Sequence, residues 1–224
     1  DGIRQVSDNI AHDLKTPLFR LRQKLETLNT ETGSISDHTT ELQGALAEAD
    51  RLLNLFNALL RIARLESDSS RTVKAALSLS ELVDDVAELY EPLAEERDQS
   101  LSVETSQPIS IHADRDMLFQ ALANLLDNAV KYTPKGGDIH LSLSSQEGFV
   151  HIRVCDSGPG VALQEREKVF HRFYRTDISR STPGNGLGLS LVKAVVRLHD
   201  GKVALRDNDP GLCVELSLPF ASEQ

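Results

Sequence analysis

Three glycines, Gly184, Gly186 and Gly188, stand just before and within the first turn of an apolar segment that ends near His199. Glycine lets backbone amides approach a phosphate closely, and the N-terminus of a helix adds partial positive charge. The spacing matches neither a P-loop, which needs Gly-Lys-Ser/Thr, nor a dinucleotide fingerprint. The glycines predict a phosphate-binding loop, and a flexible loop before a helix is the alternative.

A carboxylate and two amides extend this chemistry. Asp156 follows a strand-like run and leads into the turn sequence SGPG at 157–160, where it can accept a hydrogen bond from an exocyclic amine. A solvated turn aspartate is the alternative interpretation. Asn124 and Asn128 are one helical turn apart, so they place two neutral oxygens on one helix face. One such oxygen can complete the shell of a Mg²⁺ that otherwise binds phosphates and water.

Lys131 and Tyr132 continue the same helix by about one turn. They offer a countercharge for phosphate and a flat ring that can pack beside a base. Buried asparagines without partners are costly, so two of them in an apolar helix call for a ligand or another polar partner. Together these residues predict a site for a nucleotide with Mg²⁺.

His12 is a candidate nucleophile in the first part of the chain. It lies off the apolar stripe of its predicted helix, so we expect it to be exposed. An imidazole can attack phosphorus only through an unprotonated nitrogen. A single surface histidine most often has no function, so this assignment depends on its neighbours.

Two kinds of element must position these groups. Apolar residues recur every three or four positions from Ile3 to Leu28 and again from Leu42 to Ala63, which predicts a helical hairpin. The second helix has more apolar surface than one partner helix can cover, so we expect dimerisation into a four-helix bundle. The polar stretch ESDSSRT at 66–72 then marks a domain boundary.

Beyond this boundary the pattern is mixed. We expect a helix capped by Ser80 and a second helix capped by Asp114 that runs through Lys131. Alternating strands are predicted at 100–105, 109–113, 139–145, 149–156, 202–207 and 212–220, and a last helix at 187–199. The expected fold is an α+β sandwich, in which helices cover one face of a sheet.

The composition restricts the possible partners. The net charge of the 224 residues is −10, which argues against a nucleic-acid surface, because such a surface needs concentrated Lys and Arg. No apolar run approaches the length of a membrane span, so we expect no membrane contact by this sequence. Cys155 and Cys213 lie in strand-like runs, which favours buried, reduced thiols over a disulfide or a metal site.

Four motifs follow one another along the chain: AHDLKTPL at 11–18, NLLDNAVKY at 124–132, DSGPG at 156–160 and GNGLGLSLV at 184–192. Their order resembles the catalytic core of a two-component sensor histidine kinase. HDLKTP is similar to the H box of its dimerisation and phosphotransfer domain. The later motifs, with EKVFHRFYR at 167–175, resemble the N, G1, F and G2 boxes of the ATP-binding superfamily shared by histidine kinases, Hsp90 chaperones, MutL-type repair proteins and type II topoisomerases.

The resemblance implies domains and residue roles. It implies a phosphotransfer domain at 1–66, a linker at 67–77 and a Bergerat-type ATP-binding domain at 78–224. In the first domain it implies His12 as phosphoacceptor, Asp13 as its carboxylate partner and Thr16 as a residue that orients a hydrolytic water. In the second it implies contacts to adenine by Asp156 with Tyr132 nearby, to Mg²⁺ by Asn128, and to the phosphates by Asn124, Lys131 and Arg175. The glycine loops complete the implied ATP site with Gly158, Gly160, Gly184, Gly186, Leu187, Gly188 and Leu189.

The function implied by the resemblance is autophosphorylation of His12 from Mg-ATP and transfer of the phosphoryl group to an aspartate on a response-regulator receiver domain. Phosphatase activity towards that regulator is also implied. The expected partners are the regulator and a second copy of the chain. The first motif begins so near Asp1 that we expect a cytoplasmic fragment of an inner-membrane sensor. The alternatives are an ATPase clamp, which leaves the HDLKTP hairpin unexplained, and a phosphatase-biased or inactive dimeric scaffold.

Overall fold

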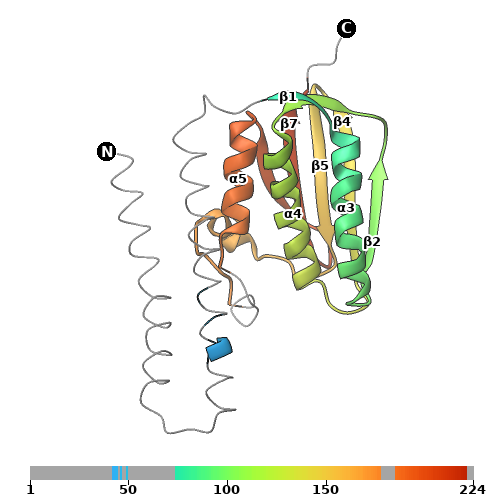
Figure 1. The fold of residues 1–224 in the computed structure, drawn as a ribbon. Helices are drawn as coiled ribbons and strands as arrows, with labels where there is room; N and C mark the ends of the chain where they lie inside the picture. Colours follow the sequence, from blue (N-terminus) through green and yellow to red (C-terminus); the bar gives the residue numbers. More distant parts are fainter. Residues whose placement is uncertain (1–41, 45, 47–48, 50–73, 178–184, 221–224) are drawn as a thin grey trace, which may run out of the picture. The chain divides into compact units, whose positions relative to one another are not determined.

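The computed structural model describes residues 42–44, 46, 49, 74–177 and 185–220 (Figure 1). The chain forms two compact units, Asp1–Ser67 and Asp68–Gln224. In the first unit the described residues are helical, as the second apolar stripe predicts, and Leu42 and Leu46 are more than half exposed. The first stripe, with His12, Asp13 and Thr16, lies outside the described residues.

The second unit is built on a five-stranded mixed sheet with strand order β2-β4-β5-β7-β6. Its strands are β2 (Ser100–Thr105), β4 (Asp138–Gln146), β5 (Phe149–Asp156), β6 (Lys202–Asp207) and β7 (Leu212–Pro219). Only β2 and β4 pair in parallel, and the other neighbours are antiparallel. This order places the end of β5, with Asp156, in the centre of the sheet.

Three helices cover one face of this sheet (Figure 1): α3 (Leu79–Glu95), α4 (Arg115–Tyr132) and α5 (Gly188–Leu198). The alternation of each strand sends every second side chain towards the helices, and those of Val150, Ile152 and Val154 on β5 are buried. The helices contribute an aliphatic face to the same core, which includes Leu82, Leu122 and Val195. The predicted α+β fold, with helices on one face, is confirmed.

Side-chain caps explain where two helices begin. Asp114 caps α4 as predicted, since its Oδ1 accepts a hydrogen bond of 3.1 Å from the N–H of Met117. Helix α3 begins earlier than predicted, because Ser78 is its cap and accepts from Glu81 N–H at 3.3 Å. The predicted cap, Ser80, instead accepts a hydrogen bond of 3.1 Å from the N–H of Ile109, which ties α3 to the segment before β3.

The end of the predicted linker belongs to the second unit. We expected 67–77 to be a linker, but Ala75–Ser78 form strand β1, which pairs antiparallel with β3 (Ser110–Ala113). Leu77 is buried in this small sheet. Ala75, Ala76 and Leu77 therefore belong to the second unit rather than to a linker, because their strand pairs with β3 and leads directly into α3.

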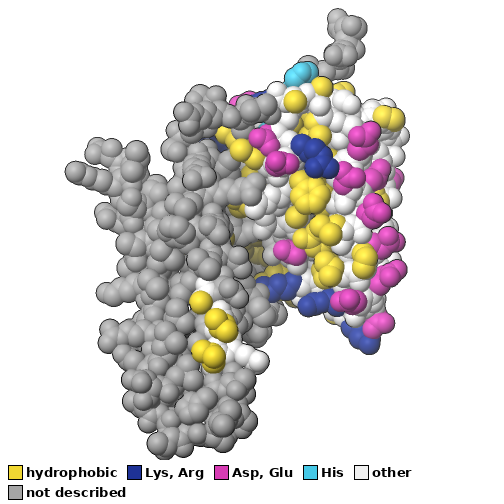
Figure 2. All heavy atoms as spheres, in the orientation of Figure 1, with side chains coloured by type: hydrophobic (Ala, Val, Ile, Leu, Met, Phe, Trp, Pro, Cys, Tyr) yellow, Lys and Arg dark blue, Asp and Glu magenta, His cyan; other side chains and the backbone are white. Residues whose placement is uncertain are grey.

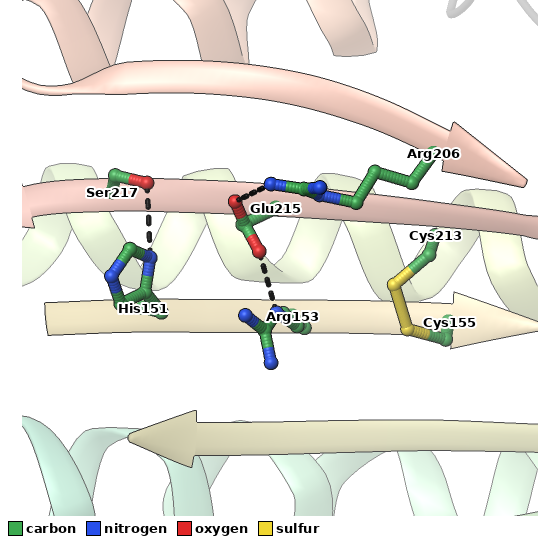
Figure 3. Close-up of polar contacts among 7 residues, drawn as sticks. All are labelled: His151, Arg153, Cys155, Arg206, Cys213, Glu215 and Ser217. Carbon is green, nitrogen blue, oxygen red and sulfur yellow. Dashed lines mark hydrogen bonds and ion pairs between the residues drawn. A yellow bond between two sulfur atoms is a disulfide. The ribbon is translucent and has the colours of Figure 1, made fainter. Parts of the chain in front are cut away.

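The face of the sheet away from the helices is polar (Figure 3). Glu215 on β7 accepts hydrogen bonds from Arg153 Nε at 2.6 Å and from Arg206 Nη2 at 2.8 Å. Two residue pairs further along the ladder, on the same face, Cys155 of β5 and Cys213 of β7 are opposite each other and form a disulfide. The prediction of two reduced thiols was wrong, because alternation places a cysteine on a face but does not reveal its neighbour across the ladder.

Acidic side chains gather over the face that carries α3 (Figure 2), where Asp84, Asp85 and Glu88 are exposed. Leu89 and Leu93 of the same helix are also exposed among them. Among the described residues, no helix has both the length and the apolar composition that crossing a bilayer requires.

Candidate ATP site

The start of α5 packs against the asparagine face of α4. A Cβ built on Gly188 would lie 3.1 Å from Asn124 Oδ1 and 3.7 Å from Asn128 Nδ2. These three predicted site residues come from segments about sixty positions apart in the sequence. Glycine at this point allows the first turn of α5 to approach both amides, so the glycine loop and the asparagine helix lie side by side, as a shared site would require.

The amide of Asn124 has a defined orientation. Its Nδ2 donates a hydrogen bond of 2.8 Å to the carbonyl of Gln120, one turn earlier in α4. The oxygen is therefore the free end of the amide and faces the start of α5, where Gly188 lies. An acceptor next to a helix N-terminus can take part in a shell of water, cation and phosphate.

The N-terminus of α5 is free of side-chain capping. Its N-cap residue is Leu187, which has no side-chain acceptor, so the first N–H groups of the helix have no cap of this kind. The Ser190 hydroxyl donates to the carbonyl of Leu187 at 2.8 Å and thereby braces the turn. Such a helix end, preceded by glycine, is suited to bind phosphate oxygens.

The loop before α5 is joined to the predicted F segment. Phe173 N–H donates to the carbonyl of Gly186 at 2.9 Å, and a Cβ on Gly186 would lie 2.9 Å from the carbonyl oxygen of Tyr174. Gly186 has a φ of +66°, which a residue with a side chain adopts only at a cost. This contact sets where the amides of the loop can lie.

Asp156 ends β5 and is buried, with 7% of its surface exposed. Its Oδ1 accepts a hydrogen bond of 2.8 Å from Gly158 N–H. Burial raises the pKa of this carboxyl, and the N–H groups of Gly158 and Leu212 counteract part of the increase. A buried carboxylate with remaining acceptor capacity favours a ligand that brings a donor, and an exocyclic amine is such a donor.

The turn after Asp156 touches the end of α4. A Cβ on Gly158 would lie 2.9 Å from the carbonyl oxygen of Tyr132. Asn124 and Tyr132 are eight residues apart, about 12 Å along the helix at 1.5 Å per residue. Helix α4 thus connects a carboxylate end at Asp156 with a glycine end at Gly188, and this separation suits the two ends of a nucleotide.

Lys131 and Tyr132 lie side by side at the carboxylate end. Lys131 Nζ donates to the Tyr132 hydroxyl at 3.0 Å and lies 4.7 Å from the centroid of its ring. Both side chains are half-buried. This arrangement keeps a positive charge beside an aromatic ring at the end of α4, and the roles of the two side chains towards phosphate and base stay predictions.

The residues present fit a magnesium ion that is carried in with a nucleotide. The described part of the chain holds no group of three or more His, Cys, Asp or Glu side chains that can bind a metal. The amide oxygen of Asn128 is a suitable single ligand, since Mg²⁺ in such sites is bound mainly by phosphates and water. Asn128 would therefore hold the ion together with the ligand rather than alone.

Of the remaining predicted site residues, three lie in the described part of the chain and one does not. Gly160 has a φ of +69° and packs against Gly211, and Leu189 is in the first turn of α5. Arg175 is half-buried and interacts with other groups of the chain, so its role towards phosphate stays a prediction. Gly184 lies outside the described residues.

Sequence reasoning missed the β6–β7 turn as part of the site. The Asn208 side chain donates to the carbonyl of Asp156 at 2.9 Å, and Gly211 packs against the same carbonyl. The Pro210-Gly211 pair signals a turn in the sequence, but no local pattern shows what the turn touches. Tyr90 was also missed: its hydroxyl donates to Asp127 Oδ1 at 3.0 Å and joins α3 to α4 beside Asn128.

Two protein-family models match the chain. Residues 3–68 match "His Kinase A (phospho-acceptor) domain" and residues 113–222 match "Histidine kinase-, DNA gyrase B-, and HSP90-like ATPase". The sensor histidine kinase HprS of Escherichia coli K12 is 34% identical over 202 residues, which are 90% of this chain and 44% of HprS. The chain thus spans less than half the length of this relative.

Solved structures agree with these matches. The mycobacterial sensor histidine kinase MprB has a TM-score of 0.59 at 32% identity, over 67% of this chain and all of the MprB chain. The histidine kinase ThkA, in complex with the response regulator TrrA, has a TM-score of 0.78 over 97% of this chain and 61% of ThkA. At 21% identity the ThkA match shows the fold alone. With both family models in chain order and the asparagine helix packed on the glycine loop, this chain belongs to the sensor histidine kinase family.

Proposed function

We propose that the chain phosphorylates its own His12 from Mg-ATP and passes the phosphoryl group to an aspartate of a response-regulator receiver domain. The observation that carries this proposal is the contact of Gly188 with Asn124 and Asn128 in the C-terminal half of α4, together with the contact of the turn after Asp156 with Tyr132 at the end of the same helix. An ATP site of this shape and a phospho-acceptor domain in the same chain are the two parts that the reaction needs.

ATP is oriented by its two ends. The ionised Asp156 carboxylate accepts a hydrogen bond from the exocyclic amine of adenine, and the Tyr132 ring packs beside the base. The N–H groups of Gly186, Leu187, Gly188 and Leu189 bind the phosphate tail, and Lys131 neutralises part of its charge. Asn128 would hold a Mg²⁺ ion, which would supply charge neutralisation to the phosphates. Positioning and electrostatics therefore account for most of the catalysis.

The transfer step uses the neutral imidazole of His12. One unprotonated ring nitrogen attacks the γ-phosphorus, the bond to the β–γ bridging oxygen breaks, and ADP leaves. The proton on the other ring nitrogen passes to the Asp13 carboxylate, which also selects the reactive tautomer. His12 and the nucleotide residues belong to different units, so the transfer requires the units to approach each other through the segment before β1.

The partners follow from the same chemistry. The phosphoryl group of phosphohistidine passes to a receiver aspartate, and the solved complex of the histidine kinase ThkA, which has the same fold, with a response regulator supports such a partner. A second copy of the chain covers the apolar surface that includes Leu42 and Leu46, which are 52% and 58% exposed.

Thr16, one turn after His12, orients water for dephosphorylation of the regulator. The whole protein is anchored in the inner membrane, with these units in the cytoplasm.

The test is incubation with γ-labelled Mg-ATP, followed by treatment of the labelled protein with acid and with alkali. We expect label that is lost in acid and kept in alkali, as a phosphoramidate bond requires. His12→Gln should abolish the label, whereas His38→Gln, a histidine of the same unit, should not. Asn128→Ala should lower labelling and ADP affinity together.

Three results would contradict the proposal. Label that persists in His12→Gln would move the phosphoacceptor elsewhere. Steady release of labelled phosphate without labelled protein, unchanged in His12→Gln, would indicate an ATPase clamp. A chain that binds no Mg-ATP would be an inactive scaffold.

A further inference from the structure

The turn between β6 and β7, residues Asn208–Gly211, lies outside the four motifs and touches the backbone of Asp156. The side-chain amide of Asn208 donates a hydrogen bond of 2.9 Å to the Asp156 carbonyl. The N–H of Asn208 donates to the carbonyl of Gly211 at 3.3 Å, which closes the turn. The amide that contacts Asp156 is therefore presented by a closed turn.

The turn and the loop after Asp156 are in backbone contact. A Cβ on Gly211 would lie 1.7 Å from the carbonyl oxygen of Asp156, and Gly211 has a φ of +124°. A Cβ on Gly160 would lie 2.8 Å from the carbonyl oxygen of Gly211. No side chain fits at either position, so a shift of the turn would shift the loop as well.

A third contact holds the far end of the loop. Arg166 Nε donates to the carbonyl of Val161 at 3.2 Å, and Arg166 Nη2 pairs with Asp207, the residue before Asn208. The Arg166 side chain is 16% exposed, so this link is shielded from solvent on one side. The β6–β7 turn thus holds the segment 156–161 at both ends.

We propose that Asn208 is a positioning residue for adenine recognition: by holding the Asp156 carbonyl, its amide sets the direction in which the Asp156 carboxylate meets the exocyclic amine. The proposal rests on the adenine contact of Asp156 in the proposed function. The carboxylate itself is oriented by Gly158 N–H at 2.8 Å, so Asn208 and Gly158 hold the two polar ends of the same residue.

Base selectivity separates positioning from simple stabilisation of the fold. Inosine diphosphate has a carbonyl oxygen where ADP has the amine, so it presents an acceptor to an acceptor, and a well-placed carboxylate rejects it. A turn that only stabilises the fold would change the affinities for both nucleotides equally. A positioning residue changes their ratio.

The experiment measures the Kd of ADP and of inosine diphosphate by calorimetry in four forms of the full chain. These are wild type, Asn208→Ala, Asn208→Ser and Ser106→Ala. Ser106→Ala is the matched control, because it removes a side-chain hydrogen bond to a backbone carbonyl, that of Leu143, at the opposite edge of the sheet. Asn208→Ser keeps a donor at the position.

We expect Asn208→Ala to lower the Kd of inosine diphosphate divided by the Kd of ADP about tenfold, the equivalent of one well-placed hydrogen bond. Asn208→Ser should restore part of the ratio, and Ser106→Ala should leave it unchanged. If Asn208→Ala does not fold, Asn208→Asp, which keeps the size of the side chain and loses the donor, should show the same loss.

Two outcomes would overturn the inference, and they are distinguishable. A selective wild type with an equally selective Asn208→Ala would reject the role of Asn208 and leave the adenine contact of Asp156 in place. A wild type that binds both nucleotides equally would reject the adenine contact itself, and with it the role of Asn208.

Discussion

The backbone N–H of Asp114 donates a hydrogen bond of 3.0 Å to Nε2 of His199. Nε2 is therefore unprotonated, and Nδ1–H donates to the carbonyl of Val195 at 2.9 Å. The bond joins the cap of α4 to the end of α5, the two helices that carry most of the candidate nucleotide-binding residues. Burial lowers the pKa of His199 below its ordinary value of 6.5, and the hydrogen bond to Val195 opposes part of the shift.

The stability of the chain should therefore depend on pH through His199. Because its pKa is lower in the folded state, the unfolded chain binds more protons once the pH falls below about 6.5. The stabilisation is complete above that pH and is lost as the pH falls towards the folded pKa. We expect the denaturation midpoint to decrease between pH 7.5 and pH 5.5, and less so in His199→Gln. An equal decrease in both proteins, with exposed His112→Gln as control, would assign the pH dependence to other groups.

Gly188→Ala should separate nucleotide binding from stability. The added Cβ would lie 3.1 Å from Asn124 Oδ1, so the amide must move by a few tenths of an ångström. Alanine is favoured over glycine in a helix by about 1 kcal/mol, so the unfolding midpoint should not fall. We expect ADP affinity, measured by calorimetry, to fall about tenfold.

A double-mutant cycle checks the cause of that loss. In an Asn124→Ala background the added methyl group has no amide to displace, so Gly188→Ala should cost much less affinity. An undiminished loss in this background would show that the Gly188 backbone, rather than Asn124, is disturbed.

Glu215 should stabilise the second unit only while it is ionised. Its side chain is 5% exposed, and burial alone would raise its pKa, but the hydrogen bonds and charges of Arg206 and Arg153 outweigh burial and lower the pKa below 4.5. The stabilisation is complete above about pH 4.5 and is lost as the pH falls through the lowered pKa. Glu215→Gln should cost about 1–3 kcal/mol of unfolding free energy at pH 7.

The measurement is denaturant unfolding at pH 7 and at pH 3.5. The difference between wild type and Glu215→Gln should be smaller at the lower pH. Exposed Glu104→Gln is the matched control and should have little effect at either pH. A difference that does not change with pH would mean that Glu215 contributes through packing rather than through its charge.

Cys155 and Cys213 should be resistant to alkylation until the chain is reduced. The disulfide joins residues 58 positions apart. A cross-link of that length lowers the entropy of the unfolded chain and so raises the free energy of unfolding by about 4 kcal/mol. Reduction should therefore lower the unfolding midpoint of wild type but not that of a Cys155→Ser, Cys213→Ser double variant. Mass spectrometry after alkylation of the unfolded, unreduced chain should find no modified cysteine. Two modified cysteines there would show that the thiols are free.

Local chemistry explains what could be predicted from the sequence. Asp114 is followed by a long apolar helix pattern, so its capping role depends only on the next three residues, and the structure agrees. The cap of α3 was assigned to Ser80 instead of Ser78, because two serines next to the same helix are equivalent locally. The hydrogen bond of Ser80 to Ile109, 29 residues away, distinguishes them.

The sequence by itself predicted the helices and strands of the second unit apart from β1, proposed the chemical groups of an ATP site and identified the family, because caps, alternation and motifs depend on residues close together in the chain. The tertiary structure alone decided which groups meet: Gly188 with Asn124, Asp156 with Asn208, and Cys155 with Cys213. These contacts depend on the strand order and on the packing of α4 against α5. Both are set by burial of the whole core, which no local pattern encodes.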